Sequence, residues 1–174
     1  MPIILPYKGV YPSIAPDAFI AQNAVVIGDV EIGSQASIWY NCVLRGDVHH
    51  IKVGARSNIQ DGTIVHVHRN NGPTIIGDGV TIGHMVLLHA CNLGDQSFIG
   101  MGAKIIDHAV VQPRAMVAAG AVVTPNQVIQ TGELWAGVPA KLKRMMTEAE
   151  LRHLAISEAN YVELAAFYLQ RTDD

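Results

Sequence analysis

The chain has 174 residues, the length of a single domain, and its 49% hydrophobic and 16% charged residues argue against disorder. A net charge of -3 offers no basic patch for nucleic acid or for an anionic membrane. No apolar run is long enough to span a bilayer, and the N-terminus lacks the pattern of a signal peptide. We therefore expect a soluble, cytoplasmic protein that has no nucleic-acid or membrane partner.

A period of six organises most of the chain. An apolar residue recurs every sixth position from Ile14 to Val123, with three extra residues after Leu44, five after Val65 and one fewer after Leu88. Neither an amphipathic helix nor an ordinary hairpin has this period, whereas hexapeptide β-helices do. The apolar series consists of Ile14, Ile20, Val26, Ile32, Ile38, Leu44, Val53, Ile59, Val65, Ile76, Ile82, Leu88, Leu93, Ile99, Ile105, Val111, Val117 and Val123.

Three hexads would close one triangular coil, so the series predicts about six coils. A glycine follows the first apolar residue of four successive coils, at Gly33, Gly54, Gly77 and Gly94. We expect this column to occupy a corner that needs a positive φ. The fold class is therefore all-β: a parallel β-helix whose stacked coils share backbone hydrogen bonds about 4.8 Å apart.

The pattern changes near the C-terminus. Thr147 and Glu150 form a capping box, and an apolar stripe with helical spacing follows to Gln170. We expect an N-terminal lead-in over 1–13, the β-helix over 14–128, a transition segment over 129–146 and a helix over 147–170. The helix is expected to pack along the outside of the prism.

Three histidines are linked by this register. His66 and His89 each follow the third apolar residue of adjacent coils, so they should stack about 5 Å apart on one edge. His84 follows the second hexad of its coil and therefore belongs to another edge. One chain should not bring His84 to the other two, but a threefold assembly of prisms would. Neutral imidazoles are preferred ligands of zinc and related metals, so the register predicts a metal site between subunits, with Gln60 and Asp61 beside His84.

Several short motifs carry a family resemblance. RGD (45–47), SNIQDG (57–62), VH (65–66), IGH (82–84), LLH (87–89) and IGMGA (99–103) resemble the gamma-class carbonic anhydrases, over nearly the whole chain. The resemblance implies a left-handed β-helix that forms a homotrimer and binds zinc, or iron or cobalt, through His66, His84 and His89. It also implies an ion pair between Arg45 and Asp47 of different subunits, contact of Gln60 with the metal-bound water, and a pocket lined by Asn58 and Tyr161.

The expected activity is that of a lyase that hydrates carbon dioxide to bicarbonate with metal-bound hydroxide. Asp61 would contact a metal-binding residue rather than the metal itself. The loop at 68–73 lacks the acidic residue that shuttles protons in the best-characterised family form, and His68 is a candidate substitute. Alternatives are a metal-dependent thioesterase, a CoA-dependent acyltransferase of the hexapeptide family, a catalytically weak homologue and a non-catalytic assembly subunit.

Overall fold

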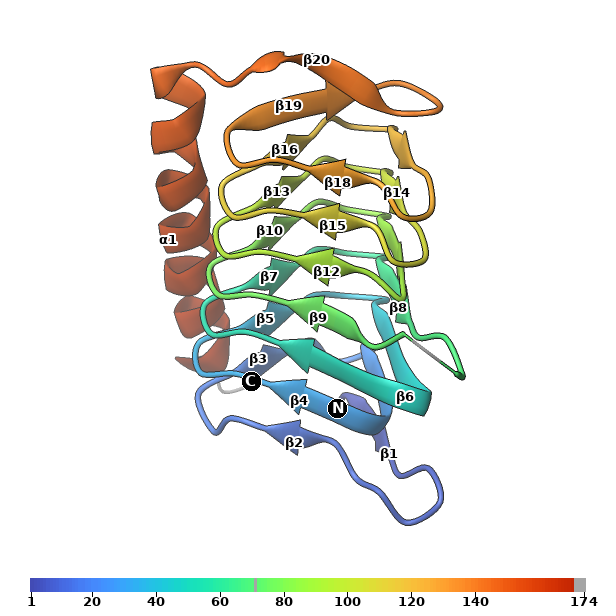
Figure 1. The fold of residues 1–174 in the computed structure, drawn as a ribbon. Coiled ribbons are helices and arrows are strands. Elements are labelled where there is room, and N and C mark those ends of the chain that lie inside the picture. The colour runs from blue at the N-terminus through green and yellow to red at the C-terminus, as the bar shows by residue number, and fades with distance from the viewer. Residues whose placement is uncertain (71, 171–174) are drawn as a thin grey trace.

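The computed structural model describes residues 1–70 and 72–170. The chain forms a triangular parallel β-solenoid of about seven left-handed coils with one helix along its side (Figure 1). This confirms the predicted fold class. The additional coil comes from the expected transition segment, where Ile129 and Trp135 continue the stack above Val111 and Val117.

The first face of the prism begins at the N-terminal end with a short strand, and its strands pair in parallel from one coil to the next. It contains β2 (Ser13–Ile14), the second part of β4 (Val25–Ile32), the second part of β6 (Val43–Val53), β9 (Thr74–Ile76), β12 (Asn92–Leu93), β15 (Val110–Val111) and β18 (Val128–Ile129).

The second face is a separate eight-stranded sheet. It contains β3 (Phe19–Ile20), β5 (Ser37–Ile38), β7 (Asn58–Ile59), β10 (Thr81–Ile82), β13 (Phe98–Ile99), β16 (Met116–Val117), β19 (Glu133–Ala136) and the antiparallel β20 (Lys141–Met145).

The third face is continuous with the first, because β4 and β6 run through the corner without a break. It contains β1 (Ile3–Leu5), the first parts of β4 and β6, β8 (Ile64–His66), β11 (Leu87–His89), β14 (Lys104–Ile105) and β17 (Val122–Val123). The insertion after Leu44 is therefore part of a long strand.

The interior is the predicted aliphatic column. From Val26 to Val123 every member of the hexad series is at most 2% exposed. The glycine column has a different cause from the one expected, since its members do not take a positive φ. A Cβ on Gly54 would lie 2.3 Å from the carbonyl oxygen of Gly77, so the stacked backbones leave no room for a side chain. The positive φ falls two residues later in each corner, at Gln35, Arg56, Gly79 and Gln96.

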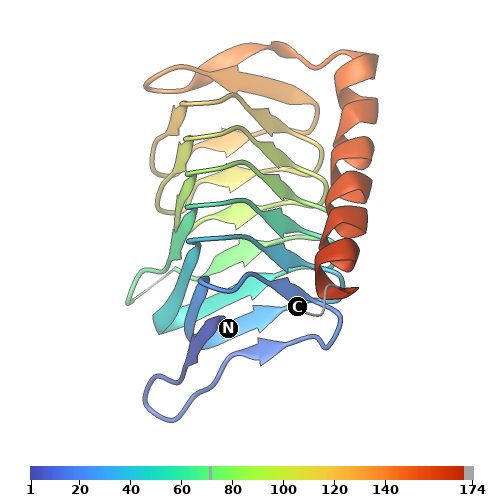
Figure 2. The ribbon, with the colours of Figure 1, turned by 180° about the vertical axis from the view of Figure 1, so that it is seen from behind.

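Helix α1 (Glu148–Gln170) descends along the second face and packs over β3, β5, β7 and β10 (Figures 1 and 2). Its first turn carries the predicted capping box, in which the Glu150 backbone N–H donates to Thr147 Oγ1 and the Thr147 N–H donates to Glu150 Oε2. In the described part of the chain, no helix has the length and apolarity needed to span a bilayer.

Candidate metal centre

His66 and His89 lie side by side on the third face. They are paired in register at the ends of β8 and β11, and their ring centroids are 5.2 Å apart. Both side chains are partly buried, with 22% and 31% of their surfaces exposed. Strand stacking thus places two imidazoles where both could reach one metal ion.

His84 lies in the corner that follows β10, on a different edge of the prism, and 43% of its side chain is exposed. Asp61 occupies the equivalent corner one coil below, and its Oδ2 lies 2.9 Å from His84 Nδ1. Across residues 1–70 and 72–170, no three His, Cys, Asp or Glu side chains of the chain gather into a metal-binding group. One chain therefore presents a pair of imidazoles on one edge and a single imidazole on another.

A carboxylate contacts each of the three imidazoles. Asp47 Oδ1 lies 3.0 Å from His66 Nε2, and Asp107 Oδ1 hydrogen-bonds His89 Nδ1. Carboxylates that hold the second nitrogen of a histidine fix its tautomer and orientation in metal sites. The Asp107 contact was not expected from the sequence: the register places Asp107 in the next coil, two residues after the core residue Ile105, but it does not give the direction of the side chain.

Arg45 and Asp47 are both on β6 and form an ion pair within the chain. Burial raises the pKa of Asp47, but hydrogen bonds from His66 and Arg45 outweigh it and leave the pKa below its usual value. The carboxylate is therefore ionised at neutral pH. The expected pair between Arg45 and Asp47 of different subunits stays a prediction.

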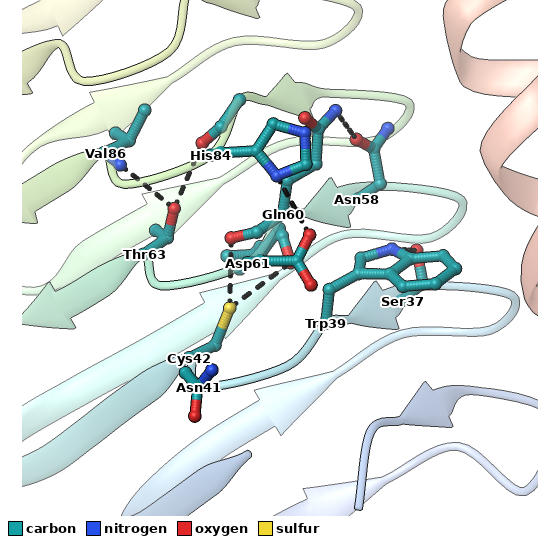
Figure 3. A network of polar contacts seen from close by, with 12 residues as sticks. Ser37, Trp39, Asn41, Cys42, Asn58, Gln60, Asp61, Thr63, His84 and Val86 are labelled. Carbon is teal, nitrogen blue, oxygen red and sulfur yellow. Dashed lines mark hydrogen bonds and ion pairs between the residues drawn. The ribbon is translucent and has the colours of Figure 1, made fainter. Parts of the chain in front are cut away.

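Gln60 and Asn58 form a buried amide pair on and beside β7 (Figure 3). Gln60 Nε2 donates to Asn58 Oδ1 at 3.1 Å, and Asn58 Nδ2 donates to Thr81 Oγ1 at 3.1 Å. Thr81 Oγ1 is in turn 3.1 Å from Ser157 Oγ on α1. The helix therefore extends a polar chain to Gln60, which fixes its amide with the nitrogen turned toward Asn58.

Side chains from the preceding coil contact the backbone of the corners that carry Gln60, Asp61 and His84. The Cys42 thiol contacts the Gln60 carbonyl oxygen at 3.1 Å, and Thr63 Oγ1 donates to the Gly83 carbonyl at 3.1 Å (Figure 3). Burial raises the pKa of Cys42 to about 11, so its thiol keeps its proton at neutral pH. These contacts hold the two corners at a fixed spacing.

Tyr161 projects from α1 and packs edge-on against Trp39, with ring centroids 5.6 Å apart. Burial and the negative charge of Asp61 raise the pKa of its hydroxyl. Tyr161 therefore lies within electrostatic reach of the Asp61 corner and stays protonated at neutral pH.

An open hollow of about 460 Å³ adjoins His84 and Gln60. Its lining is mostly apolar and includes Phe98, Met101, Met116 and Leu134. On the other edge, the His68 ring meets the His89 ring edge-on at 6.4 Å and lies 6.4 Å from the His108 ring. His68 is thus a neighbour of the paired imidazoles, and its proposed shuttle role stays a prediction.

Comparisons with known proteins support one family. The family model for the bacterial transferase hexapeptide (six repeats) matches residues 11–46. The chain is 49% identical to mitochondrial gamma carbonic anhydrase 2 of Arabidopsis thaliana over 90% of its own length, and it spans 58% of that longer relative. It is 45% identical to a carbonic anhydrase of Geobacillus kaustophilus, over 95% of this chain and 91% of that one.

A solved structure has the same fold over nearly all of the chain. The hexapeptide transferase family protein of Anaplasma phagocytophilum superimposes with a TM-score of 0.93 at 52% identity, covering 95% of this chain and 98% of that one. With relatives this similar over nearly their full length, the chain belongs to the hexapeptide-repeat family that includes the gamma carbonic anhydrases.

Proposed function

We propose that this chain is one subunit of a homotrimeric, metal-dependent carbonic anhydrase, a lyase that hydrates carbon dioxide to bicarbonate. The observation that carries the proposal is the split histidine set. His66 and His89 are paired on one edge, His84 stands on another, and a carboxylate contacts each ring. A second copy of the chain can join the two partial sites, and a threefold arrangement would do so three times.

Exposed apolar side chains around the histidines support association with further copies. Ile64 and Leu87 flank the paired imidazoles on β8 and β11 and are 47% and 36% exposed. Met85 and Met101 flank the His84 edge and are 75% and 58% exposed. A surface of this kind on both edges favours a partner that buries it, and the second copy brings the missing ligand with it.

Three neutral imidazoles suit zinc, and they suit iron or cobalt as well. The carboxylates of Asp61 and Asp107 engage Nδ1 of His84 and His89, which leaves Nε2 of both rings to bind a metal. His66 differs from the other two rings, because Asp47 engages its Nε2 and so leaves its Nδ1 to bind a metal. Zinc bound by three histidines lowers the pKa of water from 15.7 to about 7 and so supplies hydroxide at neutral pH.

The surrounding side chains would orient the reactants. Because Gln60 turns its amide nitrogen toward Asn58, its carbonyl oxygen is available to accept a hydrogen bond from water in the site. Tyr161 would line the same pocket with a neutral hydroxyl. The apolar hollow next to His84 suits an uncharged substrate such as carbon dioxide better than it suits the anionic product.

Three measurements on the purified protein test the proposal: metal content per chain, molar mass in solution and carbon dioxide hydration by stopped flow. We expect a trimer with one metal per chain and hydration that a chelator abolishes. His84→Ala should lose the metal, whereas His153→Ala, on the helix, should keep it. A metal-free monomer with an intact β-helix would refute the proposal. Cleavage of CoA thioesters without hydration would favour the thioesterase alternative.

A further inference from the structure

Asp107 lies one coil above His89, beyond the residues to which the sequence pointed. Its Oδ1 hydrogen-bonds His89 Nδ1, and the two side chains are about equally exposed, at 29% and 31%. A carboxylate oxygen accepts hydrogen bonds, so the proton of the neutral imidazole belongs on Nδ1.

Backbone hydrogen bonds hold the corner that carries Asp107. The Asp107 carbonyl accepts the Asn126 backbone N–H at 3.0 Å, and the His108 N–H donates to the Ala90 carbonyl at 2.7 Å. Backbone hydrogen bonds to the coils above and below therefore fix this turn. The carboxylate adds a side-chain contact with His89.

We propose that Asp107 is a positioning residue that holds His89 with its proton on Nδ1 and presents Nε2 to a metal ion. The orientation is a property of the metal-free chain, whereas its effect on metal affinity rests on the proposed function. The interaction is equivalent to that of Asp61 with His84. A carboxylate therefore contacts Nδ1 of a histidine in both partial sites, on different edges of the prism.

The tautomer can be measured without any metal. Nitrogen-15 chemical shifts of the imidazole rings in the metal-free protein, assigned with His89→Gln, should show His89 protonated on Nδ1. Asp107→Ala should shift His89 toward the Nε2-protonated form, and Asp107→Asn should retain the wild-type form because its amide oxygen still accepts. Asp95→Asn is the matched control: Asp95 is also a corner aspartate, but it accepts the Asp78 backbone N–H.

Zinc affinity, measured by competition with a chromophoric chelator, gives the second readout. Asp107→Ala should weaken zinc binding about 10–100-fold, Asp107→Asn less, and Asp95→Asn not at all. Wild-type His89 protonated on Nε2, or an alanine variant with unchanged tautomer and zinc affinity, would overturn the inference. Equal losses in the alanine and asparagine variants would also overturn it. A protein with the expected tautomer that binds no zinc would support the orientation and contradict the proposed function instead.

Discussion

Mixing of two inactive variants tests the division of the site between chains. His66→Ala removes one member of the paired imidazoles, and His84→Ala removes the single imidazole on the other edge. Each variant alone should form metal-free trimers. In a mixed trimer, however, a His84→Ala chain still offers its intact pair to a neighbour that carries His66→Ala and keeps its own His84.

The recovery follows from counting the interfaces. An intact site needs a His84→Ala chain on one side and a His66→Ala chain on the other. Each has a probability of about one half in an equal mixture, so about a quarter of the sites should be restored. The assay is metal content per chain after the two variants are unfolded together and refolded with zinc. Wild-type protein treated in the same way defines full occupancy.

A second mixture provides the control. His66→Ala and His89→Ala damage the same pair, which sits on one edge of one chain, so no combination of these chains restores a complete set. We expect no recovered metal from it. Equal recovery in both mixtures would mean that His66 and His89 act from different chains. No recovery in either, with normal wild-type refolding, would refute the shared site.

Three further predictions concern the parts that support the site. Ser157→Ala removes the helix end of the polar chain to Gln60, so carbon dioxide hydration should fall several-fold at unchanged metal content, with about 1 kcal/mol lost in unfolding free energy. Gly79→Ala should lower the unfolding free energy by about 1–3 kcal/mol in thermal or urea denaturation, because its φ is +64° and the new Cβ would lie 2.7 Å from Glu158 Oε2. Hydrogen bonds from Arg144 and from the Thr147 backbone lower the pKa of Glu150 to about 2. The ionised Glu150 therefore stabilises the fold fully above about pH 4.5, and this stabilisation is lost as the pH falls through about 2. Glu150→Gln should therefore lower the melting temperature at pH 7, and this effect should vanish as the pH falls below about 2.

The hexad register predicted the core because aliphatic side chains must point into the prism at one position in six. It missed the last coil, where Trp135 replaces an aliphatic residue among glycines and prolines that read as a transition. The positive φ predicted for the glycine column was also wrong. Glycine is selected both by a positive φ and by close backbone approach, and only the stacked structure distinguishes the two at Gly54.

For the site, the sequence predicted which histidines share an edge because that depends on register alone. The pairing of His66 with His89 is a direct consequence of two strands in phase. The contact with Asp107 depends in addition on the direction of a corner side chain, which no periodicity specifies. The same holds for the hydrogen bond between Ser157 and Thr81, since the hexad register does not determine how the helix is rotated about its own axis.

The β-solenoid explains why contacts about one coil apart recur throughout the site. Asp47 and His66 are 19 residues apart, and His89 and Asp107 are 18 residues apart, so each histidine meets a carboxylate of a neighbouring coil. Any insertion must keep the strands of neighbouring coils in register, because a shift would separate each imidazole from its carboxylate. Because strand pairing and carboxylate contacts fix the histidine side chains within one chain, each edge can present them in a defined orientation before assembly. Metal bound only by the assembled form would then stabilise that form through linkage, and trimer formation and metal binding would strengthen one another.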